Sequence, residues 1–247
     1  MSRVATVTET VELIPTGYTG QSGLTANSSY PYSNGQNSSS NTSSYARIQA
    51  SSTNSQGYIY YTFTVPTIPS GATITSVTAK FRARFSNGSG VTGNAQLYRT
   101  TTAVGSATSV SGTTSTVYNI ASASGWTTSN ISNLRLRVNT TRTSNNRYMY
   151  FYGADVTITY TVDETFYSVT ASCDSGGTVA PTSGEGVEGS NYTLAITPNN
   201  TGVRPYQVLD NGVDVTSQLV ESSGEASSYT VVKASGASYG FNQSGNS

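Results

Sequence analysis

Apolar and polar residues alternate along much of the first two thirds of the chain, as they do in strands that bury one face of a sheet. In the run 74–85 every second residue from Val77 onward is apolar, whereas Arg82 and Arg84 fall on the opposite face. Three further runs show the same alternation, at 59–65, 134–138 and 156–162. No stretch combines a helical period of 3.6 with a capping residue. The pattern therefore predicts an all-β protein with an antiparallel β-sandwich.

The sign of the charge changes near residue 163 and marks a predicted domain boundary. Residues 1–163 contain ten basic and four acidic side chains, whereas residues 164–247 contain two basic and eight acidic ones. We therefore expect a β-sandwich over 1–163 and a small all-β module over 164–247. One interpretation is that the opposite charges help the two parts, or neighbouring copies, to dock. The other is that each charge only keeps its own part soluble.

Two tight turns are predicted in the second part. Ser175-Gly176-Gly177 follows its first strand, and Asn211-Gly212 separates two short apolar runs. Asn-Gly is the dipeptide that best fits a type I′ turn, because both positions need a positive φ. Each turn predicts a β-hairpin.

Small polar residues dominate the composition and leave two segments without a predicted element. The chain holds 40 Ser, 39 Thr, 19 Asn and 24 Gly among 247 residues, and only 10% of its residues are charged. The segments 16–44 and 100–116 consist almost entirely of these small types. Structureless loops longer than about 12–15 residues are uncommon in compact domains. We therefore expect a homo-oligomer in which neighbouring subunits supply the contacts that order both segments.

Several classes of function are disfavoured by what the chain lacks. It contains no histidine, so Ser-His-Asp and Cys-His nucleophilic systems and histidine metal sites are excluded. Cys173 is the single cysteine, which excludes disulfides within the chain, and we expect it to be a small buried residue. With zero net charge and no Lys-rich tract, no nucleic-acid partner is expected. We expect neither a membrane span nor an export signal, because no apolar run of sufficient length occurs.

Four stretches of the second part follow one another in a specific order, at 166–171, 176–181, 189–198 and 206–215. In this order they resemble the bacterial surface-repeat modules related to the internalin B-repeat. The resemblance implies a small all-β unit, Ig-like or β-grasp-like, with an adhesive or spacer role and no catalytic residues. Val203-Arg204-Pro205 departs from the usual Gly-Tyr of that family before the third strand.

The stretches 65–83 and 153–162 resemble the jelly-roll β-sandwiches of bacteriophage appendages and of cell-surface carbohydrate-binding proteins. Such a sandwich joined to a surface-repeat module is similar in plan to phage structural proteins. The resemblance implies a non-enzymatic virion protein, either a tail appendage or fibre or a head decoration or head fibre. It would assemble in the host cytoplasm with other virion proteins and be exposed outside the cell after release. The alternative is an adhesin module that binds a host glycan or receptor.

Tyrosines cluster in two of the predicted strands. They are Tyr58, Tyr60 and Tyr61 in the first strand, and Tyr148, Tyr150 and Tyr152 in the second. Exposed tyrosine rings stack on sugars, so both groups are candidates for a glycan-binding surface. However, Tyr148, Tyr150 and Tyr152 share their parity with Tyr160 and the inward row of the run 156–162. Unless a bulge intervenes near Gly153, they belong to the core or to a subunit interface.

Arginines are predicted on the outer face of two strands, at positions Arg82, Arg84, Arg135 and Arg137. They could form a basic stripe that binds phosphates or an acidic polysaccharide. The interpretation that we favour is that they pair with carboxylates of the acidic module or of a neighbouring virion protein.

Carboxylates are too few for the paired acid and base of glycan hydrolysis. The first part contains only Glu9, Glu12, Asp155 and Asp163, of which Asp155 is predicted to face outward on a sheet. Asp210 and Asp214 flank the Asn211-Gly212 turn, but two carboxylates make a poor calcium site. We therefore expect no enzyme activity, no cofactor and no metal ion.

Overall fold

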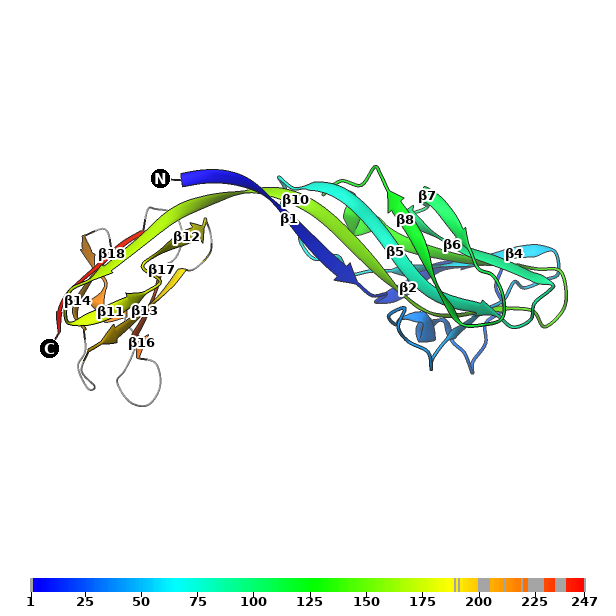
Figure 1. Ribbon diagram of the computed structural model, residues 1–247. Coiled ribbons are helices and arrows are strands. Elements are labelled where there is room, and N and C mark those ends of the chain that lie inside the picture. The colour runs from blue at the N-terminus through cyan, green and yellow to red at the C-terminus, as the bar shows by residue number, and fades with distance from the viewer. Residues whose placement is uncertain are drawn as a thin grey trace. The chain divides into compact units, whose positions relative to one another are not determined.

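The computed structural model describes residues 2–188, 190, 192–199, 205–210, 212–218, 220–221, 229–233 and 239–246 (Figure 1). These residues form strands and three short 3-10 turns, so the predicted all-β fold with antiparallel sheets is confirmed. None of the three turns comes near the length or hydrophobicity that a membrane-spanning helix needs. The chain divides into two compact units, Thr8–Val162 and Met1–Val7 with Asp163–Ser247.

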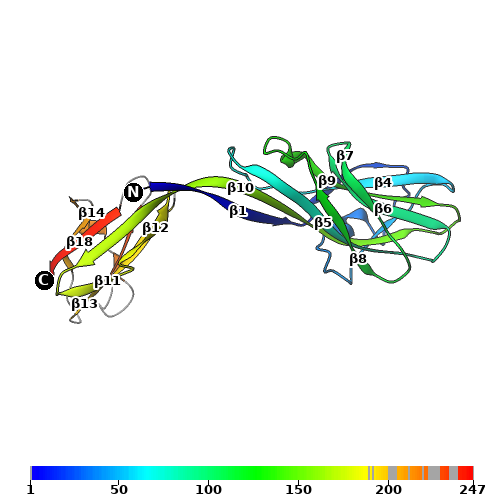
Figure 2. The ribbon, with the colours of Figure 1, turned by 45° about the horizontal axis from the view of Figure 1, so that its top comes forward.

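The unit Thr8–Val162 is a sandwich of two sheets, and most of its strands are labelled in Figure 2. In the first sheet the order is β8 (Thr116–Ala123), β5 (Thr73–Phe85) and β10 (Met149–Cys173), and β10 also pairs with β1 (Ser2–Leu13) and β3 (Ala46–Ile48). The order in the second sheet is β2 (Gly17–Ser22), β4 (Ser55–Thr62), β9 (Leu134–Arg142), β6 (Val91–Arg99) and β7 (Thr102–Ser109). Two 3-10 turns, η1 (Tyr32–Gly35) and η2 (Ile131–Asn133), lie in the connections.

The core of the sandwich lies between the two sheets. Phe81 of β5 and Leu136 of β9 are fully buried, as the alternation predicted. Tyr61 of β4 stacks on Phe151 of β10 with 4.7 Å between the ring centroids. Burying a side chain of this size contributes about 1.5–3 kcal/mol. The inward rows therefore supply the main stabilisation of the fold.

The segment 16–44 is ordered by contacts within the chain. It contains β2 and η1, and the Tyr61 hydroxyl donates a hydrogen bond to the carbonyl of Tyr32 at 3.1 Å. A Cβ at Gly35 would lie 2.2 Å from that hydroxyl, so only glycine allows η1 to approach the core so closely. The segment 100–116 likewise contains β7, which pairs with β6. The contacts that we expected from neighbouring subunits are therefore supplied by the chain itself.

The second unit is a smaller all-β module. Its strands are the C-terminal part of β10 with β11 (Gly177–Ala180), β12 (Ser183–Val187), β13 (Tyr192–Pro198), β14 (Pro205–Asp210), β15 (Val213–Asp214), β16 (Val220–Glu221), β17 (Tyr229–Lys233) and β18 (Tyr239–Asn246), and η3 (Thr216–Gln218) follows β15. One pairing, between β10 and β18, is parallel. Val169, Leu194 and Val208 are buried in its core, and Cys173 is half-buried against the same core.

The two predicted hairpins have different outcomes. β14 and β15 pair antiparallel, and Gly212 between them has a φ of 84°, whereas Asn211 lies outside the described residues. Ser175-Gly176-Gly177 does form a turn, but β11 after it pairs with β13 and not with the strand before it. A turn signal therefore identified the change of direction, but not the partner strand.

The first residues group with the module rather than with the sandwich, to which we had assigned them. Arg3 Nε donates to Glu185 Oε1 at 2.8 Å, and the guanidinium lies 4.4 Å from the centroid of the Phe166 ring. The hydroxyl of Thr6 donates to Asp163 at 2.6 Å. These contacts explain why Met1–Val7 belongs to this unit.

Candidate functional site

A β-bulge in β10 decides which way its tyrosines face. Two successive residues of β5, Arg82 and Ala83, are paired with Gly153 and Phe151, so Tyr152 is an extra residue in β10. Before the bulge, the odd-numbered residues that alternate with the tyrosines are fully buried. After the bulge, the fully buried residues are the even-numbered ones, so the inward row has changed parity. The side chains of Tyr148 and Tyr150 are therefore half-buried on the outer face of the sheet. Because of the bulge, the core assignment is wrong for Tyr148 and Tyr150, whereas Tyr152 is buried and only 4% exposed.

Gly153 makes this bulge possible. Its φ of 154° is a conformation that side chains disfavour, and a Cβ there would lie 2.2 Å from the carbonyl oxygen of Asn37. The backbone N–H of the next residue, Ala154, donates to the same carbonyl at 2.8 Å. The loop therefore packs directly on the bulged backbone, where only glycine fits.

Six side chains gather on this outer face and are called the β10 cluster: Tyr45, Arg47, Arg84, Tyr148, Tyr150 and Tyr152. Tyr150 lies across from Arg47 of β3 on one side and from Arg84 of β5 on the other. The guanidinium of Arg84 lies 4.0 Å from the centroid of the Tyr150 ring, and that of Arg47 lies 3.9 Å from the Tyr148 ring. Each such cation–π contact contributes about 0.5–2 kcal/mol.

Hydrogen bonds and ring contacts hold the β10 cluster in one arrangement. Arg84 Nε donates to the Tyr152 hydroxyl at 2.8 Å, and the Tyr150 hydroxyl donates to that of Tyr148 at 3.2 Å. The Tyr45 ring packs edge-on against Tyr150, with 4.5 Å between the centroids. Burial and the hydrogen bond with Tyr148 raise the pKa of Tyr150 to about 12. Tyr150 is therefore neutral at physiological pH and adds no negative charge beside Arg84.

A second group lies on the outer face of the other sheet and is called the β9 cluster: Tyr58, Tyr60, Tyr98, Arg135 and Arg137. The Arg137 guanidinium lies 4.1 Å from the centroid of the Tyr58 ring, and its Nη1 donates to the Tyr98 hydroxyl at 2.8 Å. Tyr60 packs edge-on against both of these tyrosines. Burial raises the pKa of Tyr60, and the positive charge of Arg137 opposes part of this increase.

The four arginines do not form one basic stripe. Arg84 belongs to β5 and Arg137 to β9, and these strands lie in different sheets that share one core. The two arginines therefore lie on opposite faces of the sandwich. Arg82 belongs to neither cluster, because its Nε donates to the carbonyl of Ser39 at 2.7 Å. In the part of the chain that the structure describes, the single ion pair joins Arg3 to a glutamate of the module, so no sandwich arginine has a carboxylate partner there.

Asp155, the outward carboxylate that we considered for catalysis, holds a loop in place. Its Oδ2 accepts hydrogen bonds from the backbone N–H of Ser39, at 3.0 Å, and from the Ser39 hydroxyl. Among the described residues no three Cys, Asp or Glu side chains gather in a way that could hold a metal ion. The arrangement gives Asp155 a structural role in anchoring the loop 36–44.

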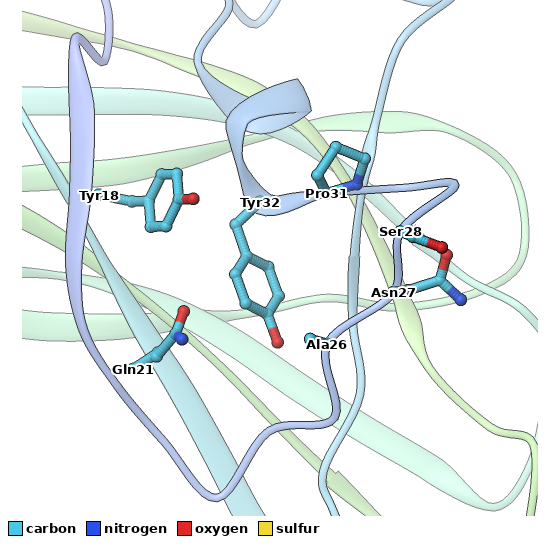
Figure 3. A pocket seen from close by; sticks show the side chains of 7 residues that line it. All are labelled: Tyr18, Gln21, Ala26, Asn27, Ser28, Pro31 and Tyr32. Carbon is cyan, nitrogen blue, oxygen red and sulfur yellow. The ribbon is translucent and has the colours of Figure 1, made fainter.

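A pocket of about 500 Å³ lies where the sequence indicated only a long polar segment (Figure 3). Its lining residues are Tyr18, Gln21, Ala26, Asn27, Ser28, Pro31 and Tyr32. Tyr18 is 42% exposed and Tyr32 is 6% exposed, and their rings meet edge-to-face with 5.9 Å between the centroids. Sequence reasoning missed this site, because scattered tyrosines in a Ser- and Asn-rich segment show no period.

No family model and no curated protein matches this chain. The two clusters and the pocket are therefore the features that indicate a function.

Proposed function

We propose that the chain is a non-enzymatic structural protein of a bacteriophage virion that assembles through the outer faces of its sandwich. It serves as a tail appendage or fibre or as a head decoration, and its C-terminal unit acts as a spacer or weak adhesive module. The observation that carries the proposal is the pair of tyrosine–arginine clusters, whose guanidinium groups have no carboxylate partner among the described residues. The virion context is supported by the resemblance of the sequence motifs alone.

Composition and geometry of the clusters favour a protein partner. Tyrosine and arginine are enriched at protein interfaces, where their large side chains supply much of the binding energy. Ring contacts and hydrogen bonds already hold Tyr150 and Arg84 in place, so little side-chain freedom is lost on binding. A partner that presents carboxylates to these arginines would add charge-assisted hydrogen bonds.

The charge of the two units fits a copy of the same chain as one such partner. The unit Thr8–Val162 contains nine basic and three acidic side chains, whereas the other unit contains three basic and nine acidic ones. Opposite charges steer association and select the partner. A homo-oligomer would bring basic sandwich faces and acidic modules of different copies within reach of one another.

Glycan binding by these same tyrosines has less support. Guanidinium groups lie over the rings of Tyr58, Tyr148 and Tyr150 at 3.9–4.1 Å. A sugar that stacks on a ring needs that ring face. The clusters therefore favour an interface over a glycan-binding surface.

The solution mass of the purified chain tests assembly. One chain has a mass of 25.8 kDa, and we expect light scattering to give a multiple of it that falls as salt is added. Arg84→Ala and Arg137→Ala should each shift the equilibrium toward the single chain. Lys80→Ala is the matched control, because Lys80 is an exposed cation of β5 outside both clusters.

Two results would contradict the proposal. A chain that stays at 25.8 kDa at every concentration and salt would exclude self-assembly through the clusters. Mass spectrometry of purified particles of the phage that encodes the chain tests its place in the virion. Absence of its peptides from those particles would exclude a virion protein.

A further inference from the structure

We infer that the pocket between β2 and η1 binds a neutral saccharide. This inference goes beyond assembly, because none of the seven lining residues belongs to the β10 or β9 cluster. The volume of about 500 Å³ falls within the range of about 300–1,000 Å³ that is typical of small-ligand pockets. The chemistry of the lining indicates the class of ligand.

Tyr18 provides an aromatic surface of the kind on which sugars stack. It lies on the edge strand β2 and is 42% exposed. Among the described residues no guanidinium lies over its ring, unlike the rings of Tyr58, Tyr148 and Tyr150. The C–H groups of a pyranose ring can therefore pack against Tyr18.

Tyr32 supplies a polar group that has no partner in the described part of the chain. Its side chain is 6% exposed, and Figure 3 shows the hydroxyl directed between Gln21 and Ala26. Hydrogen bonds are found for the Tyr32 carbonyl, which accepts from Tyr61, but not for its hydroxyl among these residues. Burial and the nearby Tyr18 raise the pKa of Tyr32, so the hydroxyl is a neutral donor and acceptor at physiological pH. A ligand hydroxyl in the pocket can therefore form a hydrogen bond with it.

The rest of the lining is uncharged, and three of its five residues are polar. Gln21 and Ser28 offer an amide and a hydroxyl group, and Asn27 offers its amide nitrogen, because its Oδ1 already accepts two backbone hydrogen bonds. No Asp, Glu, Lys or Arg lines the pocket. An anionic or cationic ligand would lose water without gaining a counter-charge. A neutral polyol is satisfied by amides and hydroxyls, which both donate and accept hydrogen bonds.

Local backbone geometry holds the lining in place before any ligand arrives. A register shift in β2 between Thr19 and Ser22 includes Gly20, whose φ is 57°, and precedes the turn into the loop. Across the pocket, Asn27 Oδ1 accepts hydrogen bonds from the backbone N–H groups of Ser29, at 3.1 Å, and Tyr30, at 3.0 Å. These bonds fix the loop, so the pocket is preformed and binding requires little ordering.

Saturation-transfer NMR on the full chain tests the inference. The probes are maltotriose, cellotriose, mannotriose and chitotriose as neutral sugars, and trigalacturonate as the acidic comparison. We expect at least one neutral probe to bind and trigalacturonate to bind more weakly or not at all. Tyr18→Ala should weaken the affinity about tenfold, and Tyr32→Phe, which removes only the hydroxyl, about fivefold.

Tyr30→Ala is the matched control, because Tyr30 is similarly exposed at 38% and lies in the same loop but outside the lining. It should bind as the unchanged chain does, and circular dichroism confirms that each variant is folded. The inference is overturned if no neutral probe binds, if trigalacturonate binds best, or if Tyr18→Ala and Tyr32→Phe bind like Tyr30→Ala. The solution mass is a separate readout, so failure here is distinguishable from failure of assembly.

Discussion

The tyrosines of the β10 cluster and those of the pocket are the same residue type in opposite surroundings. Tyr150 has a guanidinium 4.0 Å from its ring centroid, and its hydroxyl is bonded to Tyr148. Tyr18 is 42% exposed, and the hydroxyl of its neighbour Tyr32 has no partner among the described residues. In the cluster both the ring and the hydroxyl are occupied, whereas in the pocket both can accept a ligand.

This difference shows that tyrosine content alone does not identify a glycan-binding surface. A ring contributes to sugar binding only when its face is open. The side chains on the neighbouring strands determine whether that face is covered. In the cluster, Arg84 of the neighbouring strand β5 covers a face of the Tyr150 ring, and Arg47 of β3 covers a face of the Tyr148 ring. In the pocket, Tyr18 lies on an edge strand and has a strand neighbour on one side only.

The largest predicted effect is that of a substitution at the β-bulge. The bulge is what places Tyr148 and Tyr150 of the β10 cluster on the outer face of the sheet. Gly153→Ala would place a Cβ 2.2 Å from the Asn37 carbonyl at a disfavoured φ, so we expect a loss of about 3 kcal/mol in unfolding free energy. Urea denaturation measures this loss. Gly71→Ala is the control, because nothing lies within 4 Å of a Cβ there. Equal losses for both variants would contradict the assigned role of the bulge.

A double-mutant cycle of Arg84→Ala and Tyr150→Ala tests whether the ring face in the cluster is energetically closed. We expect a coupling of about 1 kcal/mol, because the guanidinium stacks on the ring at 4.0 Å. The measurement is the unfolding free energy of the four proteins in urea. Replacing Arg84→Ala by Lys80→Ala in the cycle should give additive effects. If Arg84 and Tyr150 show no coupling, the guanidinium does not close the ring face of Tyr150. The contrast with the open ring of Tyr18 would then disappear.

The last predicted effect is a dependence of stability on alkaline pH. The pKa of Tyr150 is raised to about 12 in the folded chain, whereas an unfolded tyrosine ionises near about 10. The unfolded state therefore loses its proton first, and the stability that this tyrosine contributes below about pH 10 is lost as the pH rises toward about 12. Unfolding free energies measured across this range should fall more steeply for the unchanged chain than for Tyr150→Phe. Parallel curves for the two proteins would contradict a raised pKa of the half-buried Tyr150.

Much of the sandwich core was predictable from the alternation of residues. The inward row of β5, from Val77 to Phe85, is buried as predicted, because every second side chain of a strand points to the same face. The partners of the strands were less predictable, since β11 pairs with β13 and not with the strand that its turn follows. Pairing depends on contacts between residues that are distant in the sequence.

The candidate site was predictable only in part. The sequence identified most of the tyrosines and arginines of both clusters and placed Arg84, Arg135 and Arg137 on outer faces, but it missed Tyr45, Arg47 and Tyr98. It could not decide whether Tyr148 and Tyr150 face inward, because one extra residue at a bulge reverses the parity of all residues before it. The pocket had no sequence signal, because its lining comes from an edge strand and an irregular loop.

By itself, the sequence determined the all-β class, the inward rows of the sandwich and the absence of any histidine chemistry. These properties follow from local alternation and from composition. Only the tertiary structure decided that the arginines lie on two opposite faces, that Arg84 covers Tyr150, and that Tyr18 and Tyr32 line a pocket. The physical reason is that sheet order, a single bulge and loop packing determine which side chains meet, and none of these is encoded in the period of one strand.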